Sequence, residues 1–166
     1  MIFPAQRQVL HSNIGYKLPS NSSFFKCSFY VLSIGIIYFL LVKVCSEFFL
    51  LPSVNISAFW PPNAIYAAFL LVSPRFLWKY IITVVFIANA AGNLYSDQSF
   101  SLSLGFAIAN TIEGGLIAYF TLKFNKPSVA LTSFRHFIIL IYIVMLSTAV
   151  GAIFGALNLV FHYGWN

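Results

Sequence analysis

The stretch Ala109-Asn110-Thr111-Ile112-Glu113-Gly114-Gly115 lies in the middle of an apolar run, residues 101–124. This run is long enough to cross a bilayer as a helix. Glu113 is far from both ends of the run, and an ionised acid at the centre of a span costs about 2.5–3.5 kcal/mol on insertion scales. Such residues usually face the interior of a helix bundle, where they have a polar partner. Asn110 precedes Glu113 by three residues and so shares its helix face. The run therefore predicts a helix whose polar face lies inside a packed bundle.

The composition is that of a membrane protein. Of the 166 residues, 60% are hydrophobic and 7% are charged, whereas about 25% of the residues of an average soluble domain are charged. The formal net charge of +6 does not indicate nucleic-acid binding, because excess Lys and Arg in a membrane protein collects in cytoplasmic loops. We predict an all-α, polytopic integral membrane bundle of about five transmembrane helices.

Five apolar runs predict the spans: residues 24–51, 57–72, 76–95, 101–124 and 134–160. We assign residues 1–23 to a cytoplasmic N-terminal segment, 24–160 to the transmembrane domain and 161–166 to a short C-terminal tail. The second run contains Trp60-Pro61-Pro62-Asn63, and its prolines favour an extended segment followed by a short helix over 63–72. The free amides at the start of this helix suit an anion or another acceptor. Alternatively, Trp60 is an interfacial anchor.

Basic residues predict the orientation. With the N-terminus inside, the outer side holds only Lys43, and all the other basic residues are cytoplasmic. These are Arg7, Lys17, Lys26, Arg75, Lys79, Lys123, Lys126 and Arg135. The positive-inside rule therefore predicts a cytoplasmic N-terminus and, after five spans, a C-terminus outside.

Polar residues of several spans fall at similar depths. With a helical rise of about 1.5 Å per residue, Glu113, Asn89 and Ser147 lie near the midplane of the membrane. Asn63, Asn93 and Asn110 lie in the outer half. These residues either form ordinary interhelical hydrogen bonds, worth about 0.6 kcal/mol each, or form a site for a small molecule, an ion or a proton.

Small residues predict close helix packing at two places. Gly114 and Ala118 are four residues apart on the fourth span, and Gly151 and Gly155 form a GxxxG motif on the fifth. Small residues at this spacing allow another backbone to approach closely.

The motifs of common catalytic and metal sites do not occur in the sequence. It has no HExxH motif, no Gly-rich phosphate loop and no Cys/His cluster. No nucleophile has an evident base at its depth. We therefore predict that the chain is not an enzyme and takes no cofactor and no metal.

Four motifs occur in an order that resembles the bacterial membrane-associated sensor domain family, first class (MASE). They are Trp60-Pro61-Pro62-Asn63-Ala64, Ala91-Gly92-Asn93-Leu94, Asn110-Thr111-Ile112-Glu113-Gly114-Gly115-Leu116-Ile117-Ala118 and Ser147-Thr148-Ala149-Val150-Gly151. The family pattern often has Gly soon after the prolines, where this chain has Ala64. The resemblance implies an inner-membrane input domain of about eight spans, of which this chain would be an incomplete front part or a stand-alone remnant.

The resemblance also implies a role in bacterial signal transduction. Domains of this family are usually followed by a histidine kinase or a diguanylate cyclase, which are the outputs of two-component and cyclic-di-GMP signalling. A transporter-like or channel-like subunit is the alternative, because a proline-broken helix lies beside a midplane carboxylate. A third possible function is that of a structural membrane protein without a ligand. The expected partners are the lipid bilayer, an unknown small ligand and other membrane helices, either a second copy or a membrane sensor or transporter.

Overall fold

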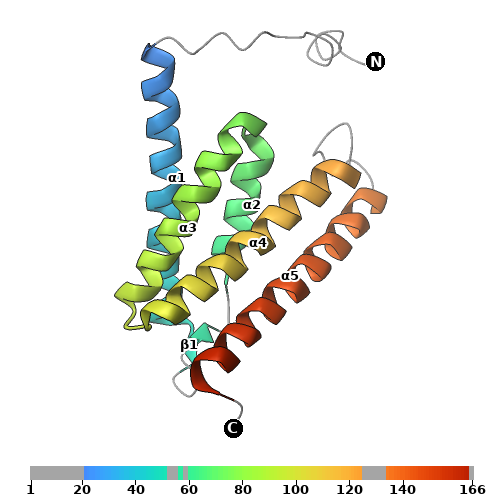
Figure 1. Ribbon diagram of the computed structural model, residues 1–166. Helices are drawn as coiled ribbons and strands as arrows, with labels where there is room; N and C mark the ends of the chain where they lie inside the picture. The colour runs from blue at the N-terminus through green and yellow to red at the C-terminus, as the bar shows by residue number, and fades with distance from the viewer. Residues whose placement is uncertain (1–20, 52–55, 58–59, 125–133, 165–166) are drawn as a thin grey trace.

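A computed structural model describes residues 21–51, 56–57, 60–124 and 134–164. Most of the predicted N-terminal segment, residues 125–133 between the fourth and fifth predicted spans, and the last two residues lie outside this part. The described residues form a helical bundle (Figure 1). Its helices are α1 (Asn21–Phe48), α2 (Pro62–Val72), α3 (Trp78–Tyr95), α4 (Phe100–Phe124) and α5 (Phe134–Tyr163), and a 3₁₀ turn, η3 (Arg75–Leu77), precedes α3. The prediction of an all-α membrane bundle is confirmed.

Four described helices, α1, α3, α4 and α5, are long and apolar enough to cross a membrane. The remaining helix, α2, has 11 residues, which rise about 16 Å, roughly half the thickness of the hydrocarbon core. Pro61 is its N-cap and Pro62 its first residue, so the helix starts one residue before the predicted position. The predicted second span is therefore a half-length helix that begins inside the bundle.

The first span ends earlier than predicted and leads into a small sheet. Strand β1 (Leu50–Leu51) pairs antiparallel with β2 (Ile56–Ser57), and neither strand is predicted from the sequence. The Ser57 hydroxyl donates a hydrogen bond of 3.0 Å to the Cys45 carbonyl. The same carbonyl also accepts the Phe49 amide at 3.0 Å, so the returning chain adds a second hydrogen bond to the last turn of α1.

The two ends of the bundle differ in charge. The start of α1, the α2–α3 turn, the end of α4 and the start of α5 lie at one end, which we call the basic end (Figure 1). Its described basic residues are Lys26, Arg75, Lys79, Lys123 and Arg135. The other end, which we call the strand end, holds β1, β2 and the α3–α4 turn. Lys43, Glu47 and Asp97 are its described charged residues, and Lys43 pairs with Glu47 at 3.8 Å.

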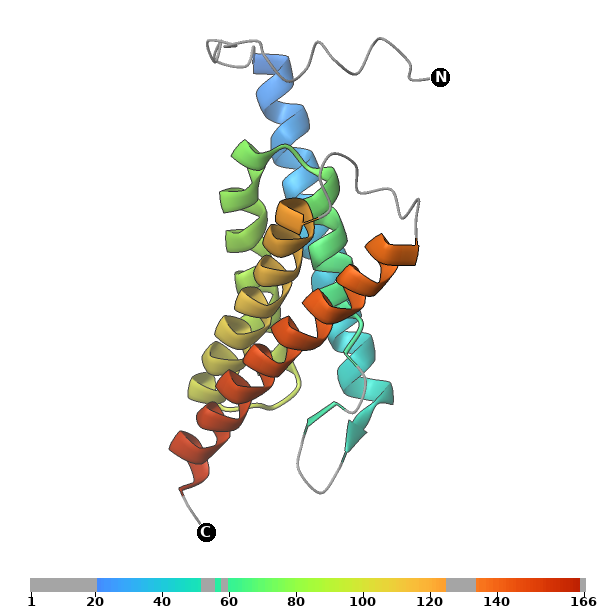
Figure 2. The same ribbon diagram turned by 90° about the vertical axis from the view of Figure 1, so that its right-hand side faces the viewer.

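Helix α4 lies at the centre of the bundle, because it contacts α2, α3 and α5. The core between α1, α2 and α3 is built from large side chains, which include Tyr38, Tyr66, Leu70 and Ile81. Helix α5 packs mainly on α4, and it is the least buried of the four long helices. It crosses α4 and separates from it toward the basic end (Figure 2). Residues of α2, α4 and α5 together line a cavity.

Candidate functional site

A chain of buried hydrogen bonds links α3 to α1 and α2. Asn93 Nδ2 donates to Asn89 Oδ1 at 2.9 Å, and Asn89 Nδ2 donates to the Tyr38 hydroxyl at 3.2 Å. The Tyr38 hydroxyl donates to Asn63 Oδ1 at 2.9 Å. All four side chains are buried, with Tyr38 1% and Asn89 0% exposed. Because buried polar groups need partners, these contacts fix how the three helices are rotated against one another.

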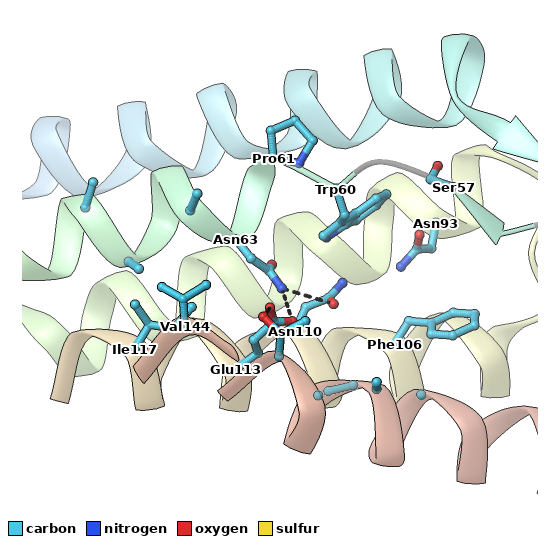
Figure 3. A pocket seen from close by; sticks show the side chains of 18 of the residues that line it. Ser57, Trp60, Pro61, Asn63, Asn93, Phe106, Asn110, Glu113, Ile117 and Val144 are labelled. Carbon is cyan, nitrogen blue, oxygen red and sulfur yellow. Dashed lines mark hydrogen bonds between the residues drawn. The ribbon is translucent and has the colours of Figure 1, made fainter. Parts of the chain in front are cut away.

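The same chain continues to the carboxylate of Glu113, halfway along α4. Asn63 Nδ2 donates to Glu113 Oε2 at 2.7 Å and, more weakly, to Asn110 Oδ1 at 3.3 Å (Figure 3). From the other side, the Thr148 hydroxyl of α5 donates to Glu113 Oε1 at 2.8 Å. One connected network therefore joins all five helices. Every donor on the path from Asn93 points toward Glu113, and hydrogen bonds aligned in this way polarise and strengthen one another.

Local sequence explains why these side chains meet. Asn89 and Asn93 are four residues apart on α3, and Asn110 and Glu113 are three apart on α4, so each pair shares one helix face. Asn63 belongs to the first turn of α2 because the prolines before it start the helix at that point. The half-length of α2 thus places an amide side chain at the depth of the carboxylate.

Two glycines of α5 face the polar side of α4. A Cβ atom on Gly151 would lie 2.8 Å from Glu113 Oε2, and a Cβ on Gly155 would lie 3.9 Å from the Phe106 ring. Glu113 therefore occupies the space that a side chain at position 151 would need. In the described bundle, the GxxxG face of α5 packs on α4.

The small residues of α4 serve a different neighbour. A Cβ on Gly114 would overlap the Tyr66 ring of α2, and Ala118 is fully buried. The missing side chain at position 114 lets the Tyr66 ring lie directly against the α4 backbone. Glu113 and Gly114 are adjacent, so this contact also fixes the height of α2 against the carboxylate.

A cavity of about 820 Å³ lies beside the network, between α2, α4 and α5. Its polar wall includes Asn63, Asn110, Glu113 and Thr148, and the ring of Phe106 and the indole of Trp60 border it on the side of the strand end (Figure 3). Serines of the strand end, Ser46, Ser57 and Ser96, line its outer part. Asn93 and Gln98 also line it, and the rest of the wall is apolar, with alanine the most frequent residue. A mostly apolar pocket with a few converging polar groups is typical of small-molecule sites.

The structure brings together five of the six predicted site residues, namely Asn63, Asn89, Asn93, Asn110 and Glu113. The sixth, Ser147, is buried, but the α5 hydroxyl that reaches Glu113 belongs to Thr148. Sequence reasoning also missed Tyr38. The signal was present, since Tyr38 lies at the midpoint of the predicted first span and the same depth calculation places it beside Glu113.

The start of α2 has little capacity for an anion. The amides of Ala64 and Ile65 both donate to the Pro61 carbonyl, at 3.1 and 3.3 Å, and Pro62 has no amide hydrogen. The nearest charged group is the Glu113 carboxylate, which repels anions. Among the described residues, no group of three His, Cys, Asp or Glu side chains is placed to hold a metal ion.

A family model described as MASE1 matches residues 30–163 of the chain. The match covers every residue of the hydrogen-bond network and all the described residues that line the cavity. Searches of curated proteins and of solved structures find no match.

Proposed function

Because the chain belongs to the MASE1 family of membrane sensory domains, we propose that it is the input part of a bacterial signal-transduction system in the inner membrane. The output would be a histidine kinase or a diguanylate cyclase, and the role of this chain would be sensory, not catalytic. The observation that carries the proposal is the network that joins all five helices to one carboxylate at a cavity wall. An ionisable residue within a membrane span is a candidate functional group.

The network suggests how binding in the cavity would change the bundle. A ligand that contacts Glu113 competes with the donors Asn63 and Thr148, which come from α2 and α5. These two helices form opposite walls of the cavity, and α5 packs mainly on α4. A change in either hydrogen bond would therefore shift α5 relative to α2. Near the strand end, Asn158 Nδ2 donates to the Leu102 carbonyl at 3.0 Å and His162 contacts the Ser101 hydroxyl at 2.9 Å, so α5 would pivot about that end.

We place the basic end in the cytoplasm. Five described Lys and Arg residues lie there, whereas Lys43 is the one described Lys or Arg at the strand end, and cytoplasmic loops are enriched in Lys and Arg. The polar outer part of the cavity, lined by Ser46, Ser57 and Ser96, then faces the outside. In this orientation the ligand would arrive from outside and α5 would carry the signal inward.

The test joins the full chain to a diguanylate cyclase through one added apolar span, so that the cyclase lies in the cytoplasm. The chain is compared with its Glu113→Gln variant, which keeps the shape of the side chain and removes its charge. Glu47→Gln, the same change on an exposed residue at the strand end, is the matched control. We expect Glu113→Gln to change the cellular level of cyclic-di-GMP, whereas Glu47→Gln leaves it unchanged. Equal levels in both variants would argue against a sensory role for Glu113.

One feature favours the alternative, a transporter-like subunit. Transporters often bind substrates beside broken helices near the midplane, and α2 starts inside the bundle next to Glu113. Transport requires net movement of a solute across the membrane. Accumulation of a cavity ligand inside vesicles that contain the purified chain would favour this alternative, and binding without uptake would favour the sensor.

A further inference from the structure

The cavity has one polar pole at its carboxylate and an extended apolar wall. Uncharged polar residues border it at the strand end, namely Ser46, Ser57, Asn93, Ser96 and Gln98. The pole consists of Glu113, Asn110 and Asn63 (Figure 3). The small apolar residues of the wall come from α2, α4 and α5, and they are Ala64, Ala67, Ala68, Ala109, Ala152 and Gly155. A ligand that fits this wall has a polar group at Glu113 and an apolar body beside the small residues.

We propose that the cavity binds an organic ammonium ion, with its charged nitrogen at Glu113 and its apolar body along α4. This inference rests on the proposed function, because binding of such an ion would be the input signal. It goes further by naming the charge and the shape of the ligand.

The charge follows from the residues around the cavity. Glu113 is the one charged side chain among the described residues that line it. The salt bridge in the described part of the chain joins Lys43 to Glu47 at the strand end, so no Lys or Arg described there pairs with Glu113. Opposite charges attract more strongly inside a bundle than in water. A ligand cation would supply the counter-charge that the described protein groups do not.

The carboxylate has room for ammonium donors. An ionised carboxylate offers about four acceptor positions. Asn63 occupies one position on Oε2 and Thr148 occupies one on Oε1. Each oxygen can therefore also accept an N–H group of a ligand, which would share the carboxylate with Asn63 and Thr148 and weaken their hydrogen bonds.

The apolar body follows from the length and lining of the wall. Phe106, Asn110, Glu113 and Ile117 recur every three or four residues and lie on one face of α4, so this wall is about 16 Å long. Trp60 and Phe106 border the cavity on the strand-end side of Glu113 (Figure 3). Aromatic faces attract cations, and they also pack against rings and alkyl chains. A ring or short alkyl chain attached to the ammonium group fits this wall.

Other classes of ligand fit less well. A hard divalent cation such as calcium takes six or more oxygen ligands, and the polar pole has one carboxylate whose neighbours already bond to one another. A cavity of about 820 Å³ is also much larger than a bare ion. An anion would face the Glu113 carboxylate, and the described lining contains no Lys, Arg or His to attract it.

The test uses isothermal titration calorimetry to measure the affinity of the full chain, in lipid nanodiscs, for three probes of similar shape. The probes are 2-phenylethylammonium, the neutral 2-phenylethanol and the anionic phenylacetate. We expect the ammonium probe to bind at least about tenfold more tightly than the alcohol, because a buried charge pair is lost with the alcohol, and phenylacetate not to bind. Equal affinity for the ammonium and the alcohol, or no ammonium binding at millimolar concentration, would overturn the proposal. This comparison uses the unmodified chain, so its result cannot be caused by a substitution that prevents folding.

Two matched pairs of variants locate the site. Glu113→Gln should lower the affinity for the ammonium probe at least about tenfold, whereas Glu47→Gln should not change it. Ala152→Leu should block the cavity, whereas Ala149→Leu, three residues earlier on α5 and also exposed, should not. Unchanged binding by Glu113→Gln would also overturn the proposal. If 2-phenylethylammonium does not bind but Glu113→Gln still changes the cellular level of cyclic-di-GMP, the sensory function stands and only the proposed ligand class is wrong.

Discussion

Tyr38 of α1 and Asn63 of α2 are joined by a buried hydrogen bond of 2.9 Å, which the Tyr38 hydroxyl donates. The same hydroxyl accepts a hydrogen bond from Asn89 of α3. One oxygen atom of α1 therefore connects the asparagines of α3 with the side chain that holds Glu113.

The first prediction concerns a substitution that removes this oxygen. Tyr38→Phe keeps the ring but leaves buried groups of Asn63 and Asn89 without a partner, and each such group costs about 1–3 kcal/mol. We expect a lower midpoint of thermal unfolding for the purified chain in detergent. Tyr142→Phe, on the exposed side of α5, is the control and should leave the midpoint unchanged. An equal midpoint for wild type and Tyr38→Phe would show that the hydroxyl does not stabilise the bundle.

The second prediction compares two adjacent glycines of α4. A Cβ on Gly114 would overlap the Tyr66 ring, whereas one on Gly115 would lie 3.9 Å from the Tyr66 hydroxyl. Gly114→Ala should destabilise the chain by about 1–3 kcal/mol, the usual effect of overpacking. Gly115→Ala should be neutral or stabilise it by up to about 1 kcal/mol, because Ala favours the helix. Thermal unfolding of both variants checks this, and the reverse order of stability would contradict the packing of α2 on α4.

The third prediction tests the orientation. Alkaline phosphatase is active only outside the cytoplasm. We expect activity when it is fused after Asn166 and none when it is fused after Pro127, because α5 runs from the basic end to the strand end (Figure 1) and the basic end is proposed to be cytoplasmic. Activity after Pro127 alone would reverse the orientation and place the outer part of the cavity in the cytoplasm.

Hydropathy and helical rise predicted the main features of the fold. The spans follow from long apolar runs, and the common depth of Glu113 and Asn89 follows from counting residues along each helix. Pro61 and Pro62 marked the start of α2 correctly to within one residue. These features depend on one helix at a time, so the sequence of that helix is enough to predict them.

Features that depend on two helices could not be predicted in this way. Ser147 and Thr148 have nearly the same depth, and only the rotation of α5 against α4 decides which hydroxyl reaches Glu113. The role of Tyr38 likewise depends on α1 lying beside both α2 and α3. The small sheet of β1 and β2 was missed because strands of two residues are too short to show a periodic pattern.

The central claim is that the carboxylate of Glu113 holds the basic-end half of α5 in place. Spin labels at Val72 on α2 and Phe137 on α5, both exposed, report the distance between these helices at the basic end. Labels at Phe48 and Phe161, also exposed, report on the strand end. Cys27 and Cys45 are free cysteines and would be replaced by alanine in every labelled chain.

The decisive measurement is pulsed electron paramagnetic resonance. It gives the distribution of distances between the two labels of each pair, in the chain with Glu113 and in the Glu113→Leu variant. Leucine cannot accept the hydrogen bonds of Asn63 and Thr148, while the contacts of Asn158 and His162 at the strand end remain. We predict that Glu113→Leu shifts or broadens the Val72–Phe137 distribution and leaves the Phe48–Phe161 distribution unchanged. An unchanged Val72–Phe137 distribution in a folded Glu113→Leu chain would contradict the claim.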